Sequence, residues 1–115
     1  MAYVVAMDQG ICIHRFGGPE VLELRDLETP RLGPDDVLVR VAAAGVNFID
    51  TYQRSGAYPR PLPLVLGLEG AGVVEAVGER VTEFAVGDRV AWAQGSASYA
   101  THTVLPEAAL VPVPA

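Results

Sequence analysis

Residues 67–77 read GLEGAGVVEAV, a glycine-rich segment that is either a phosphate-binding loop or part of a β-structure. A dinucleotide-binding loop has the spacing G-x-G-x-x-G between a strand and a helix, because the phosphate then lies at the helix N-terminus. Here the spacing is G-x-x-G-x-G, and residues 73–77 carry β-branched side chains that favour a strand. We therefore predict that these glycines allow a bend and a close approach of backbones within a β-structure and bind no phosphate.

The rest of the chain has the same pattern of short apolar runs separated by turn residues, with 12 glycines and 9 prolines. In residues 37–44, alternation places Val37, Val39 and Val41 on one face and Arg40 on the other. This pattern favours a mainly β barrel or sandwich. Further strands are expected at residues 2–7, 11–16, 21–27, 89–93, 99–104 and 110–113.

Two details of the N-terminal part can be tested against a structure. Residues 8–10 (Asp-Gln-Gly) are typical of a tight turn between strands. The alternation in residues 21–27 predicts a strand with one half-buried face.

Residues 47–54 are expected to form a short helix. Asn47 suits the N-cap position, and Asp50 falls in the first turn, where a carboxylate interacts favourably with the helix dipole. Gly56 is expected to end the helix. The prolines that follow predict an extended loop over residues 59–63.

Composition limits the classes of protein to consider. A chain of 115 residues is long enough for one domain with an ordinary hydrophobic core. Its net charge of −6 argues against nucleic-acid binding, which needs a basic surface. No apolar run is long enough to cross a membrane, and the N-terminus lacks the basic start of a signal peptide. With Cys12 as the one cysteine, we expect a cytoplasmic protein without disulfides.

Four segments occur in an order that resembles one family. They are GGPEVL at residues 17–22, AGVNFIDTYQRSG at 44–56, GLEGAG at 67–72 and GDRV at 87–90. Together they resemble the zinc-free quinone oxidoreductase branch, which includes the zeta-crystallins, of the medium-chain dehydrogenase/reductase superfamily. The resemblance implies that residues 1–115 form a GroES-like, partly open β-barrel with one or two short helices. In the family a Rossmann domain follows, and that domain is expected to be absent from this chain.

The same resemblance indicates that no metal is bound. Where the alcohol dehydrogenases of the superfamily hold zinc with a cysteine and a histidine, this chain has Asn47 and Leu68. Neither a carboxamide nor an alkyl group is a normal zinc ligand. Cys12, His14 and His102 do not have ligand spacing, although strand alternation predicts that Cys12 and His14 share a face.

The resemblance implies an NADPH-dependent quinone oxidoreductase, which transfers hydride or electrons from NADPH to a quinone. Asn47, Asp50 and Tyr52 match positions of the family's active site, where Asn47 and Tyr52 lie near the cofactor and Tyr58 is a candidate for binding the quinone. The cofactor phosphates are expected on the Rossmann domain, so the isolated chain should be inactive. The whole protein is expected to form a homodimer.

Two other functions stay open at this stage. An enoyl reductase shares the zinc-free barrel and similar sequence patterns. A non-catalytic GroES-like binding module is also possible, because a fold alone does not decide a function.

Overall fold

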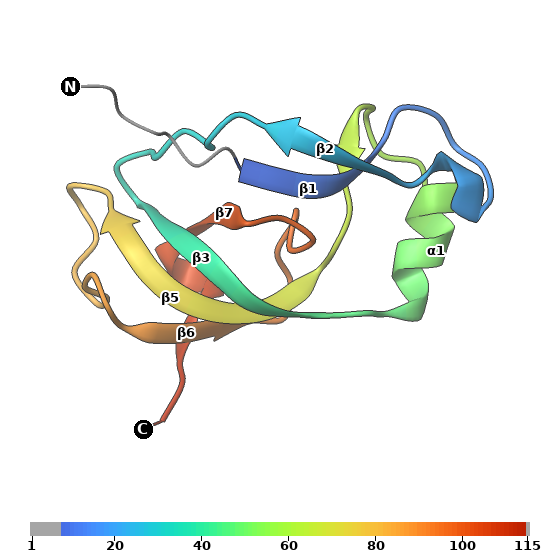
Figure 1. Cartoon of the computed structure of the whole chain (residues 1–115). Coiled ribbons are helices and arrows are strands. Elements are labelled where there is room, and N and C mark those ends of the chain that lie inside the picture. The colour runs from blue at the N-terminus through green and yellow to red at the C-terminus, as the bar shows by residue number, and fades with distance from the viewer. Residues whose placement is uncertain (1–7, 115) are drawn as a thin grey trace.

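The computed structural model of the chain describes residues 8–114, which form a mainly β structure with α1 at one end (Figure 1). No helix among these residues is long and apolar enough to span a membrane. In chain order the elements are β1 (Asp8–Ile13), η1 (Pro19–Val21), β2 (Glu23–Leu27), β3 (Asp36–Gly45), α1 (Phe48–Ser55), β4 (Leu64–Val65), β5 (Glu69–Val77), β6 (Arg89–Trp92), β7 (His102–Pro106), η2 (Glu107–Ala109) and β8 (Val111–Pro112).

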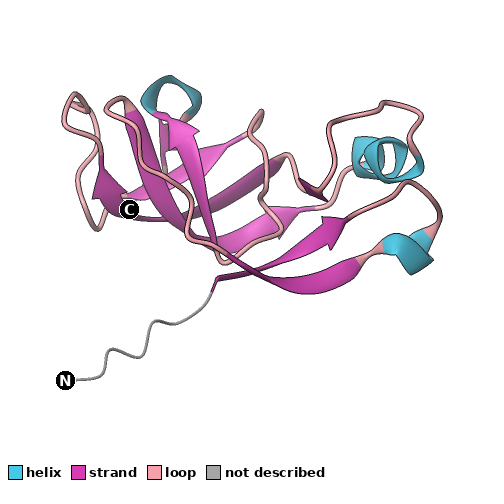
Figure 2. Cartoon of the chain, turned by 90° about the horizontal axis from the view of Figure 1, so that it is seen from above, coloured by secondary structure: helices cyan, strands magenta, loops and turns pink. Residues whose placement is uncertain are grey.

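The strands form two antiparallel sheets, one of five strands in the order β7-β3-β5-β6-β8 and one of three in the order β2-β1-β4. A backbone bridge between Gly10 and Ala100 joins them, and the Ile11 N–H donates to the Tyr99 carbonyl at 2.8 Å. The sheets curve around a common interior but do not close (Figure 2). The expected partly open barrel with a short helix is therefore confirmed.

Strand β3 supplies much of the barrel core. Val37 and Val39 are fully buried, whereas Arg40 is exposed, as the alternation predicted. Val41 is partly buried against the same core cluster. The buried members of this cluster are Val37, Val39, Val74, Phe84, Val90, Trp92, Leu105 and Leu110. A second, smaller cluster of Ile13, Val21 and Leu66 lies at the other end of the domain, beside α1.

The glycine-rich segment lies inside the larger sheet, as predicted. A Cβ atom on Gly72 would meet the carbonyl oxygen of Arg40, and one on Gly70 would lie 2.8 Å from that of Ala43. Gly67 has a φ of 108°, which side chains rarely allow. These glycines let β5 approach β3 closely, so the strand begins at Glu69, earlier than residue 73.

The N-terminal part differs from the sequence prediction. Residues 8–10 are not a turn: they pair with β2 as the first half of β1. The expected strand at residues 2–7 lies outside the described residues. β1 ends at Ile13, so His14 lies beyond the strand; Cys12 is buried and His14 is exposed, and that the two share a face stays a prediction.

The boundaries of two other strands, β2 and β7, also differ from the sequence prediction. Residues 19–21 form a 3-10 turn, and residues 23–26 of β2, an edge strand that pairs with β1 alone, are exposed on both faces. The prediction of a half-buried face for residues 21–27 is therefore wrong. β7 begins at His102, and residues 99–101 before it form backbone hydrogen bonds to β1, to Leu66 after β4 and, through the Thr101 carbonyl, to Val41 of β3.

His102 lies between carboxylates that come from both sheets. Its Nδ1 is 2.6 Å from Asp8 Oδ1, and its Nε2 is 2.7 Å from Glu75 Oε2. Glu75 also pairs with Arg40 at 3.2 Å. Only an imidazolium can donate to both carboxylates. Burial alone would lower the pKa of His102, but the hydrogen bonds and charges of Asp8 and Glu75 outweigh it, so the pKa is raised.

We expect the stability of the domain to fall as the pH rises through this folded-state pKa. Because the folded pKa lies above the unfolded value of about 6.5, the contribution is complete near and below pH 6.5 and is lost as the pH rises through the higher folded-state pKa. His102→Gln should flatten this dependence and cost on the order of 2 kcal/mol at low pH. Thermal unfolding followed by circular dichroism across a pH series measures it, with the exposed His14→Gln as control. Parallel curves for wild type and His102→Gln would contradict the imidazolium assignment.

A second prediction concerns the close approach of β5 to β3. Gly72→Ala should lower the free energy of unfolding by about 2 kcal/mol, because the added methyl group meets the rigid backbone at Arg40. Gly18→Ala is the matched control, since there the methyl group meets only the flexible side chain of Glu20. Urea unfolding compares the two, and equal losses would argue against the packing role of Gly72.

Candidate functional site

The predicted helix forms as α1, and local capping explains its limits. Asn47 is the N-cap with extended φ and ψ of −118° and 152°. The Asp50 side chain reaches back and accepts the Asn47 backbone N–H at 3.0 Å. Gly56 ends the helix with a φ of 90°, and its N–H donates to the Tyr52 carbonyl at 3.1 Å.

The Asp50 carboxylate is buried, with 5% of its surface exposed. Its Oδ2 atom accepts a second hydrogen bond, from the hydroxyl of Tyr99. Burial raises the pKa of Tyr99, and the hydrogen bond to Asp50 and the negative charges of Asp50 and Glu69 raise it further. The tyrosine therefore stays protonated and acts as a donor. Asp50 thus connects the start of α1 with the segment that precedes β7.

Three aromatic side chains form a row on and beside α1. The rings of Phe48 and Tyr52 lie 5.3 Å apart, and those of Tyr52 and Tyr58 lie 5.1 Å apart, both pairs edge to face. The backbone N–H of Tyr58 donates to the Tyr52 carbonyl at 3.1 Å, which holds the loop against the helix. The exposed fractions are 74% for Phe48, 39% for Tyr52 and 57% for Tyr58. We call these three residues the aromatic row.

A hollow of about 140 Å³ opens against α1, where Asp50, Thr51 and Arg54 line it and the aromatic row does not. Apolar side chains form most of it, with Asp50 and the edge of Tyr99 among the polar ones. Arg54 also lines it, but its Nε donates to the Gly17 carbonyl at 3.1 Å. The lining residues are Leu22, Val46, Asp50, Thr51, Arg54, Leu66 and Tyr99.

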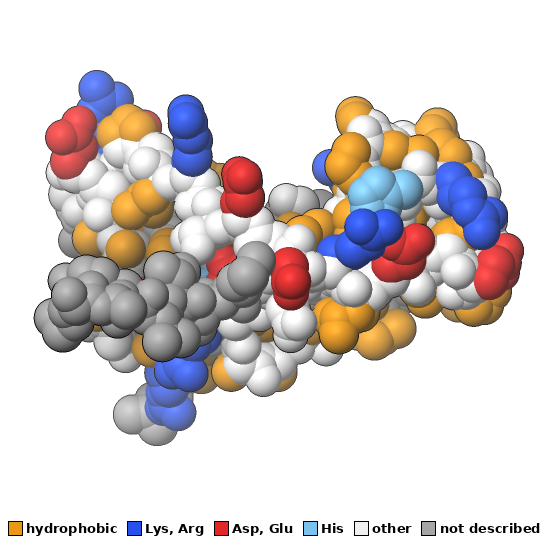
Figure 3. All heavy atoms as spheres, turned by 45° about the horizontal axis from the view of Figure 1, so that its top comes forward, with side chains coloured by type: hydrophobic (Ala, Val, Ile, Leu, Met, Phe, Trp, Pro, Cys, Tyr) orange, Lys and Arg blue, Asp and Glu red, His pale blue; other side chains and the backbone are white. Residues whose placement is uncertain are grey.

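The surface agrees with a site that receives an uncharged group. In Figure 3 the end of the molecule that carries α1 has hydrophobic side chains on its outline, and the arginines on the visible face are scattered, several beside acidic groups. This face carries no continuous basic patch among the described residues.

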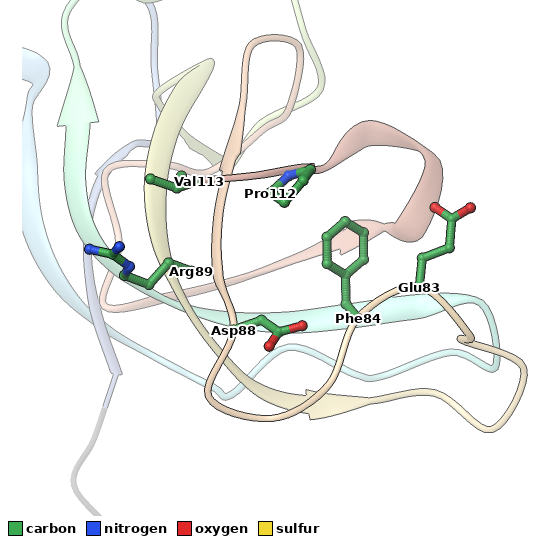
Figure 4. A pocket seen from close by; sticks show the side chains of 6 residues that line it. All are labelled: Glu83, Phe84, Asp88, Arg89, Pro112 and Val113. Atoms are coloured by element: carbon green, nitrogen blue, oxygen red, sulfur yellow. The ribbon is translucent and has the colours of Figure 1, made fainter. Parts of the chain in front are cut away.

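A larger hollow of about 320 Å³ lies elsewhere, near β6 and β8 (Figure 4). Its polar groups make local contacts: Asp88 accepts the Ala85 N–H at 2.9 Å, and Arg89 donates to the Pro114 carbonyl at 2.9 Å. None of the residues predicted for the site lines it. We therefore take the smaller hollow beside α1 as part of the candidate site.

The structure brings the predicted residues together at one end of the barrel. Asn47, Asp50 and Tyr52 belong to α1 or its cap, and Tyr58 contacts Tyr52. The structure places Asp50 inside the protein, where it holds the helix, and its Oδ1 has no hydrogen-bond partner among the described residues. Sequence reasoning missed Tyr99, because no local pattern indicates a partner 49 residues away.

The residues at the zinc position of the superfamily do not fit a zinc ion. The pairing of Gly45 with Glu69 places Asn47 and Leu68 just beyond the same end of β3 and β5. The Nδ2 atom of Asn47 is buried and lacks a partner in the described structure, but it is a hydrogen-bond donor without a lone pair for a metal. Leu68 offers a side chain without any donor atom.

The sequence pattern of the family described as Alcohol dehydrogenase GroES-like domain matches residues 33–115. The chain belongs to this family. The GroES-like domain is 58% identical over 101 residues to a quinone oxidoreductase of Pseudomonas aeruginosa, a match that covers 86% of this chain and 31% of that protein. Its expected place in the quinone oxidoreductase branch is confirmed.

Solved structures are similar to this GroES-like domain throughout its length. The quinone oxidoreductase of Pseudomonas syringae pv. tomato has a TM-score of 0.91 and 56% identity, and the match covers 94% of this chain and 34% of that one. The quinone oxidoreductase of Escherichia coli, complexed with NADPH, has a TM-score of 0.89 and 39% identity, covering 92% of this chain and 33% of that one. The chain thus spans about a third of the length of these relatives.

We expect the stability of the GroES-like domain to depend on the buried carboxylate. Asp50→Ala leaves the Asn47 N–H and the Tyr99 hydroxyl without their acceptor, so it should lower the free energy of unfolding by about 2 kcal/mol. Glu28→Ala, at an exposed position, should change it by less than about 0.5 kcal/mol. Urea unfolding measures both free energies. An unchanged free energy of unfolding for Asp50→Ala would show that the hydrogen bonds of Asp50 to Asn47 and Tyr99 do not stabilise the domain.

Proposed function

We propose that this GroES-like domain is the substrate-side part of an NADPH-dependent quinone oxidoreductase, in which hydride or electrons pass from NADPH to a quinone. The observation that carries the proposal is the aromatic row: three exposed rings on a helix whose position is fixed by a buried carboxylate. Exposed rings of this kind suit flat, uncharged ligands. The names of the similar proteins support the same assignment.

The residues have separate roles in this proposal. Tyr52 and Tyr58 contact the nicotinamide or the quinone through their rings, which restricts the two reactants to a productive distance and orientation. Asn47 donates a hydrogen bond from its unpartnered Nδ2 to one of these ligands. Asp50 acts through the backbone, because its carboxylate holds the cap residue Asn47 and so fixes the start of the helix on which Tyr52 lies.

NADPH supplies the reducing equivalents when it is bound, and its phosphates contact residues outside this domain. The chain has 8 basic and 14 acidic residues, so it is poorly suited to a phosphate-rich ligand. Three of its arginines, Arg25, Arg40 and Arg80, already pair with carboxylates. We infer that a Rossmann domain of the complete protein holds the phosphates, as in the family that the sequence resembles.

The reaction proposed here needs no metal. Zinc in a dehydrogenase polarises a carbonyl or alkoxide oxygen, whereas a quinone ring is already electron-poor. Asn47 and Leu68 cannot replace the usual zinc ligands. We therefore propose a zinc-independent enzyme.

We further propose that the complete protein is a cytoplasmic homodimer that binds neither nucleic acid nor membrane.

The complete protein that contains residues 1–115 should oxidise NADPH in the presence of benzoquinone, and EDTA should not change the rate. Tyr52→Ala and Tyr58→Ala should each raise KM for the quinone about tenfold, because a ring contact of about 1.4 kcal/mol is lost. Val86→Ala, which removes an exposed apolar side chain between β5 and β6, should leave KM unchanged. Absorbance of NADPH follows the reaction.

Two results would change the proposal. Loss of activity on chelation would overturn the zinc-independent reaction. Faster reduction of an enoyl thioester than of any quinone would instead indicate an enoyl reductase that uses the same site.

A further inference from the structure

Tyr99 contacts the site from outside the helix that carries the predicted residues. It precedes β7, whereas Asp50 belongs to the first turn of α1, and the two lie 49 residues apart in the sequence. Tyr99 lines the hollow against α1 together with Asp50, and its hydroxyl donates to Asp50 Oδ2. The position of this hydroxyl therefore bears on the position of the helix.

The backbone of Tyr99 is held on both sides by the barrel. Its N–H donates to the Leu66 carbonyl at 3.0 Å, and its carbonyl accepts the Ile11 N–H at 2.8 Å. Gly67 packs directly beneath it: a Cβ atom there would lie 2.7 Å from the Tyr99 nitrogen and 2.8 Å from its ring. The backbone of Tyr99 is thus fixed by the barrel, and its hydroxyl can fix the first turn of α1 relative to the barrel.

Asp50 receives both of its hydrogen bonds on one oxygen. Oδ2 accepts the Asn47 N–H at 3.0 Å and the Tyr99 hydroxyl. The first bond lies within the helix cap, so it cannot orient α1 relative to the barrel. The second one can, because its donor belongs to the barrel. Deleting the hydroxyl leaves the capping bond in place, as well as the bonds of Arg54 to Gly17 at the other end of α1, and removes only the attachment of the first turn to Tyr99.

We propose that Tyr99 is a positioning residue for ligand binding, which acts through Asp50 to set the position of Asn47 and the aromatic row relative to the barrel. This inference rests on the proposed function, since it assigns Tyr99 to the site that binds the quinone and nicotinamide rings. Tyr99 takes no part in the redox step.

The first test uses kinetics of the complete protein. Tyr99→Phe should raise KM for benzoquinone about fivefold and leave kcat within about twofold. A displaced aromatic row binds the quinone ring more weakly, but no reacting group is removed. The matched control is Ser98→Ala, which deletes the adjacent buried hydroxyl, a group without a partner in the described structure. It should leave KM unchanged. A KM for Tyr99→Phe equal to that of wild type would overturn the proposal.

A double-mutant cycle separates positioning from general destabilisation. If Tyr99 acts through Asp50, the KM of Tyr99→Phe/Asp50→Ala should equal that of Asp50→Ala alone, because alanine removes the acceptor of the Tyr99 hydroxyl. Independent, multiplying effects of the two substitutions would overturn the proposal, as would a rise in KM for Ser98→Ala equal to that for Tyr99→Phe.

A spectroscopic test distinguishes failure of this inference from failure of the proposed function. Burial and Asp50 raise the pKa of Tyr99, so its hydroxyl should ionise at a higher pH than that of a free tyrosine, and Asp50→Asn should lower that pH. If wild type reduces no quinone but this change is observed, the proposed function fails and the pairing stands. If Asp50→Asn leaves all tyrosine ionisation unchanged, the pairing itself is absent and the inference is overturned.

Discussion

The buried Asp50 carboxylate is the contact on which the arrangement of the site depends. Its Oδ2 accepts the backbone N–H that begins α1 and the hydroxyl of Tyr99 from the barrel. A carboxylate that is 5% exposed is costly to bury without partners, so the fold provides donors from two separate elements. The result is a short helix of eight residues with a defined place, although a helix of that length is not stable by itself.

The barrel that supplies this support depends on a second constraint, the close approach of β5 to β3. Gly70 and Gly72 lie where a side chain would meet the backbone of β3, and Gly67 makes room for Tyr99. The glycine-rich segment that invites comparison with a phosphate loop is therefore a packing surface. Through Gly67 the two constraints are connected, because the glycine beneath Tyr99 helps to fix the hydroxyl that Asp50 accepts.

Much of this could be predicted from the sequence where the signal is local. The alternation of β3, the capping residues Asn47 and Gly56 and the glycine spacing each act within a few residues, and the structure agrees with them. Where long-range pairing decides, prediction failed: residues 8–10 look like a turn but form β1, because β2 and the segment before β7 pair with them. Tyr99 was missed for the same reason. The family could be identified from the sequence motifs, whereas Tyr99 could be identified as the partner of Asp50 only from the structure.

In the proposed function, the domain contacts uncharged groups through aromatic rings and hydrogen bonds, and another part of the protein binds the phosphates. Its central claim is that the aromatic row forms one wall of the nicotinamide and quinone site. The most direct measurement is a crystal structure of the complete protein with NADPH bound. We predict that the nicotinamide ring contacts Tyr52 and that the phosphates contact residues outside this domain. A nicotinamide ring bound away from α1, or phosphates held by residues 8–114, would contradict the account.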